Sequence, residues 1–205
     1  LALEYPISSL YEVIQMGSFA LKIQKMYGYT DYEMAVIKYS ITALFSELSK
    51  IIILSIFFLY IGKFNFFITS CVLLIFLRIN GGGYHCKHYI TCLLLTACIS
   101  VAAIIFLPLI NIPNYSIVLL VLTICLFTNY FIGPVSSPYR PEPDNSLIKR
   151  CKNNCSLTIF IFFIIVSIFN SNIVIRPYLI VGFWTIILHT LQLIVAKILR
   201  KGDLY

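Results

Sequence analysis

The sequence has few charged residues and very few acidic ones. Only 11% of its 205 residues are charged, and 8 are Asp or Glu, whereas a soluble domain averages about 25% charged residues. No polar stretch is long enough to enclose a core of its own. We therefore exclude an ordinary water-soluble enzyme and expect lipid to be the main solvent of the folded chain.

Apolar residues make up 60% of the chain, with 16 Phe and 14 Tyr. A helix needs about 20 apolar residues to cross the hydrocarbon layer of a bilayer. We predict an all-α integral membrane protein with six membrane-embedded helices, over residues 41–62, 64–79, 89–110, 116–134, 156–172 and 177–197. The second and fifth of these stretches are short, so each is a span, a re-entrant piece or an interfacial helix.

The N-terminal segment is too polar to span a membrane. Ser9 and Glu12 have the spacing of a capping box, and apolar residues recur among polar ones up to Tyr27. This pattern indicates an amphipathic helix on the membrane surface, or one packed against the bundle. We expect an interfacial segment over residues 1–33 and a polytopic membrane domain over residues 34–205.

The 15 Lys and Arg residues lie in short clusters at the ends of apolar stretches. This distribution favours a role in membrane orientation over binding of nucleic acid. With six spans and both termini in the cytoplasm, only Lys63 and Arg176 lie outside. Thirteen cations then lie inside: Lys22, Lys25, Lys38, Lys50, Arg78, Lys87, Arg140, Lys149, Arg150, Lys152, Lys197, Arg200 and Lys201.

The loop after the second apolar stretch carries the residues best suited to catalysis. A cysteine nucleophile needs a base, and a histidine can remove its proton and later protonate a leaving amine. In one continuous helix, His85 and Cys92 would be about 10.5 Å apart along the axis, too far for a hydrogen bond. Glycines 81–83 accept positive φ and would let the loop fold back. If the next helix begins near residues 87–89, Cys92 lies in its first turns, where the helix dipole favours a thiolate.

The same loop has two other interpretations. In the first, His85 is a histidine at the membrane interface and Cys92 a cysteine that only packs. The spacing of the two residues, taken alone, favours this interpretation over a catalytic pair. His85, Cys86, His88 and Cys92 are four potential zinc ligands, but adjacent ligands seldom complete a tetrahedron. We therefore expect no metal and no cofactor. The chain has seven cysteines, an odd number, most of them in apolar stretches or expected cytoplasmic loops, so we expect free thiols.

Several other polar residues have both a structural and a functional interpretation. Glu47 and Lys50 lie one helical turn apart near the start of an apolar stretch and are expected to pair close to the headgroups. Arg78 either reaches the headgroups or binds a carbonyl or carboxylate of a substrate. His189 is expected to be a hydrogen-bonded histidine within the bundle. The loop over residues 133–154 contains four prolines and ends with a basic cluster at Lys149 and Arg150.

The sequence around these residues resembles the accessory gene regulator B family of membrane cysteine endopeptidases. The likeness consists of Arg78, a glycine turn at Gly82 and Gly83, His85, and Cys92 seven residues later. A second match is the proline-bearing loop that follows residues 133–134 and ends at residues 147–150. Size, basicity and hydropathy agree over most of residues 9–201.

The resemblance implies a function and partners. His85 would be the base and Cys92 the nucleophile, with Arg78, Gly82 and Gly83 supporting the site and the cations Lys149 and Arg150 binding substrate. The substrate would be a short amphipathic quorum-sensing propeptide of the AgrD type. Cleavage of its C-terminal tail through an acyl-thioester would lead to a thiolactone or lactone ring. The resemblance also implies a homodimer in the lipid of a bacterial cell membrane, with the active site facing the cytoplasm.

Two non-enzymatic functions compete with this interpretation. A small membrane transporter or exporter fits the six spans and a histidine within a helix, but the apolar stretches contain almost no charge. A non-catalytic membrane scaffold is the other alternative. Both predict that Cys92 is dispensable.

Overall fold

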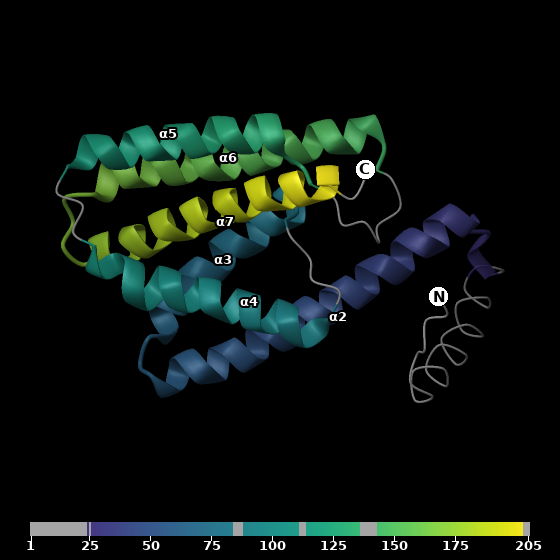
Figure 1. Cartoon of the computed structure of the whole chain (residues 1–205), viewed down its shortest axis with the longest axis horizontal. Coiled ribbons are helices and arrows are strands. Elements are labelled where there is room, and N and C mark those ends of the chain that lie inside the picture. Colours follow the sequence, from purple (N-terminus) through teal and green to yellow (C-terminus); the bar gives the residue numbers. More distant parts are fainter. Residues whose placement is uncertain (1–23, 25, 84–87, 111–113, 136–142, 203–205) are drawn as a thin grey trace. The chain divides into compact units, whose positions relative to one another are not determined.

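The computed structural model describes residues 24, 26–83, 88–110, 114–135 and 143–202. Six helices among them are long and apolar enough to cross a membrane, which confirms the prediction of an all-α membrane protein. Figure 1 shows them as α2 to α7. Their bounds are α2 Asp31–Tyr60, α3 Phe64–Gly81, α4 Tyr89–Val101, α5 Tyr115–Ile132, α6 Asn145–Phe169 and α7 Arg176–Gly202. The interfacial helix predicted within residues 1–33 lies mostly outside the described residues.

Two helices begin well before the apolar stretches that predicted them. The start of α2 is fixed by a capping box, in which the backbone N–H of Thr30 donates to Glu33 and that of Glu33 donates to the Thr30 hydroxyl. The start of α6 is capped by the Asp144 carboxylate, which accepts from the backbone N–H of Asn145. Hydropathy detects only the apolar part of a helix, so the prediction missed these polar first turns.

The third span is one rod in the prediction but changes its winding in the structure. After Val101, α4 continues as a π-helical turn, Ala102–Phe106, and then as a 3₁₀ turn, Leu107–Leu109. Pro108 has no backbone N–H and clashes with the carbonyl four residues earlier in regular α-helix. The proline therefore accounts for the loss of α-helical winding at this end of the span.

The described chain consists of two compact units, which divide within α2 between Phe45 and Ser46. In the larger unit, 61% of the apolar span of α7 is buried, against 33% or less in each of the other spans. Helix α7 packs against α3, α5 and α6, and Figure 1 shows α5, α6 and α7 running alongside one another. The core between them is apolar, with Leu77, Leu122, Ile159, Phe162, Val166 and Ile186 among its buried side chains.

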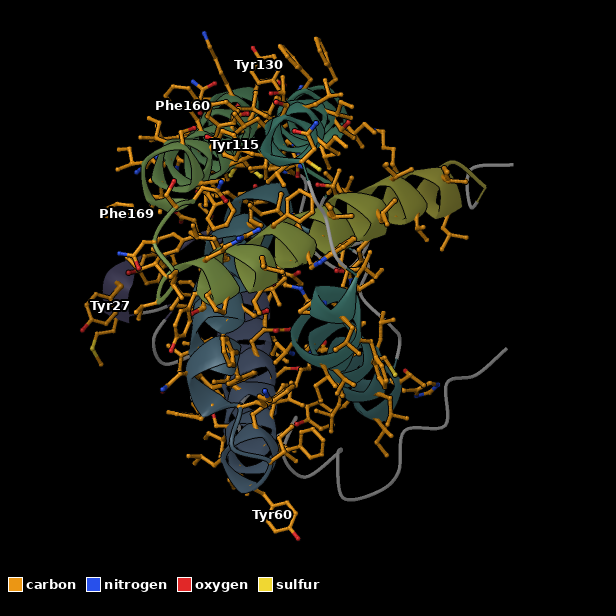
Figure 2. All side chains as sticks on the ribbon, turned by 90° about the vertical axis from the view of Figure 1, so that its left-hand side faces the viewer. Tyr27, Tyr60, Tyr115, Tyr130, Phe160 and Phe169 are labelled. Atoms are coloured by element: carbon orange, nitrogen blue, oxygen red, sulfur yellow. The ribbon has the colours of Figure 1, made fainter. Side chains whose placement is uncertain are left out.

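The outer faces of the helices carry large apolar side chains. Figure 2 shows Tyr60, Tyr130 and Phe160 projecting away from the helices, and 91%, 44% and 50% of these side chains are exposed, respectively. Water would oppose such a surface, whereas the hydrocarbon of a bilayer accommodates it. The chain is therefore a multi-pass membrane protein.

Candidate active site

Cys92 lies in the first turns of α4, as the sequence predicts. The helix begins at Tyr89 after His88, and the backbone N–H of Cys92 donates to the His88 carbonyl at 3.1 Å. Only 5% of Cys92 is exposed. The N-terminal turn of a helix favours a nearby anion, because its amide dipoles point the same way and its first N–H groups have no helical partner.

The ammonium group of Lys50 is the nearest described cation to this thiol. Its Nζ lies 3.3 Å from Cys92 Sγ and 2.7 Å from Oε1 of Glu47. Lys50 is 2% exposed. The Glu47–Lys50 ion pair was predicted, and the structure confirms it. The burial of Lys50 against Cys92 was not, because the two residues are 42 positions apart and the sequence does not show which spans meet.

Arg78 joins the same cluster from the last turn of α3. Its Nη1 lies 3.2 Å from Oε2 of Glu47, so the carboxylate holds one cation on each oxygen. Arg78 is only 15% exposed in its side chain, so it points inward rather than reaching out to the headgroups. The structure shows Arg78 paired with Glu47, and its predicted role in binding substrate stays a prediction.

A side-chain hydrogen bond ties α2 to the start of α4 beside the cluster. The Ser49 and Tyr89 hydroxyls lie 2.7 Å apart. The Tyr89 ring also lies under Lys50, with Nζ 5.9 Å from the ring centroid. Neither residue was singled out from the sequence. The sequence held one clue to this cluster, because Glu47 and Lys50 are charged residues inside an apolar stretch. An ionisable group within a membrane span usually has a function.

The glycine turn ends α3 and pairs with the chain after α5. Val135 N–H donates to Gly81 C=O at 3.0 Å, and Gly83 N–H donates to Val135 C=O at 3.4 Å. Gly82 has φ of +73°, and a Cβ there would lie 2.1 Å from the Val135 carbonyl oxygen. Gly82 and Gly83 both have positive φ, as predicted for this turn, whereas Gly81 is the last residue of α3. The turn thus brings the two loops singled out from the sequence side by side.

The predicted base and its neighbours fall in a gap of the structure. His85 and Cys86 lie outside the described residues, so the approach of His85 to Cys92 stays a prediction. His88 is described, caps α4 through its backbone and is exposed. Among the residues that are described, no three His, Cys, Asp or Glu side chains gather as a metal site would require.

The basic cluster at Lys149 and Arg150 lies in the first turns of α6, so its prediction as part of a loop is wrong. Both side chains are exposed. One turn further along α6, Asn154 donates to Asn80 of α3 at 3.2 Å. This contact holds the start of α6 beside the end of α3 that carries Arg78. The two cations therefore belong to the same end of the bundle as the Cys92 cluster.

Asp144 has a structural role at this end of the bundle. Besides Asn145, its carboxylate accepts a hydrogen bond from the Ser146 hydroxyl. Bonds from Ser146 and from the backbone N–H groups of Asn145 and Ser146 lower the pKa of Asp144. Asp144 therefore caps α6, and Glu142, the other acidic residue of this loop, lies outside the described residues.

His189 is buried in the bundle as expected, but it lacks the hydrogen bond that we predicted. Neither ring nitrogen has a partner within the described part of the chain, nor has the side-chain amide of Gln192 one turn away. The imidazole lies against the end of α3, where a Cβ on Gly81 would be 3.1 Å from Nε2.

The other described cysteines are set in the helices. Cys71, Cys98, Cys125, Cys151 and Cys155 carry free thiols. Cys155 lies within α6, is 2% exposed and donates to Asn129 Oδ1 at 3.7 Å. The Asn129 amide in turn donates to the Thr190 hydroxyl at 2.7 Å. These polar groups connect α5, α6 and α7 within the bundle.

Comparison with known proteins connects these features to one family. The family model for Accessory gene regulator B matches residues 17–194. An AgrB-like protein of Clostridium beijerinckii is 30% identical over 116 residues, which cover 55% of this chain and 57% of that protein. The chain thus spans little more than half the length of this relative. No solved structure is significantly similar to the chain.

Proposed function

This chain belongs to the accessory gene regulator B family, and on that basis we propose that it is a membrane cysteine endopeptidase that processes a quorum-sensing propeptide. Membership of the family supports a role in quorum sensing. The observation that carries the enzymatic proposal is the position of Cys92, which is buried in the first turns of α4. A thiol held there is exposed to the positive end of the helix dipole, and the thiolate is the reactive form.

The first chemical step is attack on a peptide bond. The Cys92 thiolate attacks the carbonyl carbon at the start of the C-terminal tail, and the C–N bond breaks. His85, protonated when the thiol gave up its proton, donates that proton to the departing amine. The products are the free tail and an acyl-thioester on Cys92.

The second step distinguishes a cyclising enzyme from a simple protease. The thioester retains much of the energy of an activated acyl group, so a cysteine of the same propeptide can displace Cys92 and close a thiolactone. A serine would close a lactone in the same way. A site recessed at the membrane face limits access of water and raises the effective concentration of the tethered nucleophile.

Capture of the substrate depends on charge at the same end of the bundle. Exposed Lys149 and Arg150 at the start of α6 would attract an acidic segment of an amphipathic AgrD-like propeptide. Arg78 supports the site through Glu47, and Gly82 with Gly83 sets the path of the chain toward His85. A homodimer in the membrane is part of this proposal.

The orientation of the protein is a separate part of the proposal. Thirteen of the 15 Lys and Arg residues lie inside when both termini are cytoplasmic. A membrane-impermeant thiol reagent on intact cells should then label a Lys63→Cys variant and leave Cys151, which is partly exposed, unmodified. Labelling of Cys151 from outside would contradict this orientation. A reporter fused after Asn145 gives an independent measurement.

The acyl-enzyme provides the test of the enzymatic function. We expect a propeptide whose ring-closing cysteine is changed to alanine to be attacked by Cys92, with nothing tethered to displace it. A covalent adduct should accumulate on the wild-type protein and be released by hydroxylamine or excess small thiol, as a thioester is. Mass spectrometry of the intact protein measures it, and the Cys92→Ala and His85→Ala variants should form none.

Two outcomes would contradict the proposal. Cleavage that persists in Cys92→Ala but is lost in Cys86→Ala would mean that the nucleophile is wrongly assigned. Absence of any cleavage by the purified wild-type protein would favour the transporter or scaffold. Rapid formation of a linear acid from the altered propeptide would leave the peptidase in place and exclude a water-limited site.

A further inference from the structure

Among the residues that the structure describes, the charges around Cys92 balance only if its sulfur carries one of them. Lys50 and Arg78 each contact one oxygen of Glu47, which leaves two cations and a single carboxylate in the cluster. Lys50 is almost fully buried, where a lone excess cation is costly. The atom on its other side is Cys92 Sγ, at 3.3 Å. A thiolate there would make the local charge neutral.

We propose that Lys50 is a catalytic residue whose ammonium group stabilises the Cys92 sulfur whenever that sulfur is negatively charged. Glu47 orients the ammonium from one helical turn away. Arg78 touches neither the sulfur nor Lys50 in any contact described and acts through Glu47, as a positioning residue. The inference deepens the proposed peptidase function, on which its catalytic consequence rests. The ionisation of Cys92 can be measured without any substrate.

The consequence for catalysis lies in the ring-closing step. In the acyl-enzyme, the sulfur is neutral, and Glu47 is the one described anion that still contacts Lys50. The substrate thiol gives its proton to His85 and attacks the acyl carbon, and the C–S bond to Cys92 breaks. The electron pair of that bond returns to the Cys92 sulfur, next to the ammonium. A stabilised thiolate leaves faster, so Lys50 favours the displacement that closes the ring.

Other ionisable groups surround this cluster and belong in any measurement of pH dependence. On α4, the Tyr89 ring lies beside Lys50, and His88 precedes the helix. On α3, Cys71 is close enough to Glu47 to interact electrostatically with it. On α7, His189 interacts with Arg78 in the same way. None of these four groups makes a described contact with Cys92 Sγ, whereas the ammonium group of Lys50 does.

The test is the pH profile of Cys92 alkylation in the full-length protein in lipid nanodiscs. Iodoacetamide is small and uncharged and reacts with the thiolate, and mass spectrometry of the peptide that contains Cys92 gives its rate. For wild type, the midpoint of the profile should lie below the ordinary thiol value of about 8.5. In Lys50→Met it should rise by about one pH unit or more, with about a tenfold slower rate at pH 7.

Two further variants separate charge from packing. Lys50→Arg keeps the cation and should restore the rate to within about threefold of wild type. Lys63→Met is the matched control, because Lys63 lies over the Phe66 ring and makes no described contact with a thiol. It should leave the Cys92 profile unchanged. Alkylation of Cys151 in each preparation reports on whether the bundle is intact.

The outcomes are distinct from those that test the peptidase. An unchanged midpoint in Lys50→Met, or a wild-type midpoint at or above the ordinary value, would overturn the role of Lys50. The wild-type profile decides even if Lys50→Met does not fold. If the midpoint shifts as expected but wild type cleaves no propeptide, the ion pair stands and the proposed function fails. If Cys92 cleaves propeptide with an ordinary midpoint, the function stands and the inference about Lys50 fails.

Discussion

Two regions of the membrane bundle each bury a cysteine, but they surround it with different chemistry. Where α2, α3 and α4 meet, Cys92 lies 3.3 Å from a lysine ammonium. Where α5, α6 and α7 meet, Cys155 lies 3.7 Å from a neutral amide oxygen. Burial is nearly equal, at 5% and 2% exposed. The difference indicates that burial by itself does not make a thiol reactive, whereas an adjacent cation favours its reactive form.

The largest expected effect is on activity when each cysteine is removed. Cys92→Ala should reduce propeptide cleavage by about a thousandfold or more, because the nucleophile is gone. Cys155→Ala, the matched control, should keep cleavage within about threefold, since that thiol only packs and donates a weak hydrogen bond. Cleavage of a purified propeptide, followed by mass spectrometry, measures both. Equal losses in the two variants would remove the distinction between the regions.

The second prediction concerns the turn that joins the two regions. Gly82→Ala should destabilise the protein by about 3 kcal/mol or more, because φ is positive and the new Cβ meets the Val135 carbonyl oxygen at 2.1 Å. Gly62→Ala is the control, since Gly62 has nearly the same φ but nothing within 4 Å of a Cβ. Its cost should be about 1 kcal/mol. The free energy of unfolding in mixed detergent micelles measures both, and similar values would show that contact with Val135 is unimportant.

The third prediction separates stability from activity in the second region. Thr190→Val removes one hydrogen-bond partner of Asn129 and should lower the free energy of unfolding by about 1 kcal/mol. Cleavage per folded molecule should not change. Thr123→Val is the control, because its exposed hydroxyl bonds only to the Leu119 carbonyl of its own helix, and it should cost less than about 0.5 kcal/mol. A loss of cleavage in Thr190→Val without unfolding would link the second region to catalysis.

The smallest expected effect is at the capped end of α6. The pKa of Asp144 is below its ordinary value of 3.8 because the folded state donates hydrogen bonds to its carboxylate. The stabilisation it contributes should therefore be complete above about pH 4 and fade as the pH falls through the lowered value. The measurement is the difference in thermal unfolding midpoint between wild type and Asp144→Ala across this range. A difference that grows toward acid pH would contradict the cap.

The sequence predicted the membrane class and the number of spans because both depend on local hydropathy. It was less accurate at the ends of helices, where Asp144 and the Thr30–Glu33 pair start helices that apolar content does not register. It predicted that Glu47 and Lys50 pair, since they are one turn apart on a single helix. The hydrogen-bond partner predicted for His189 is not found among the described residues. The local sequence does not indicate which polar groups of other helices come near this histidine.

The sequence by itself determined that this chain lies in lipid, and that Cys92 follows a glycine turn near the start of a helix. Those features rest on neighbours in the chain and on helical period. Only the tertiary structure decided that Lys50 contacts Cys92, that Glu47 joins Lys50 to Arg78, and that the glycine turn pairs with Val135. These contacts join separate helices, and which faces of apolar helices meet is set by side-chain packing across the whole bundle rather than by any local pattern.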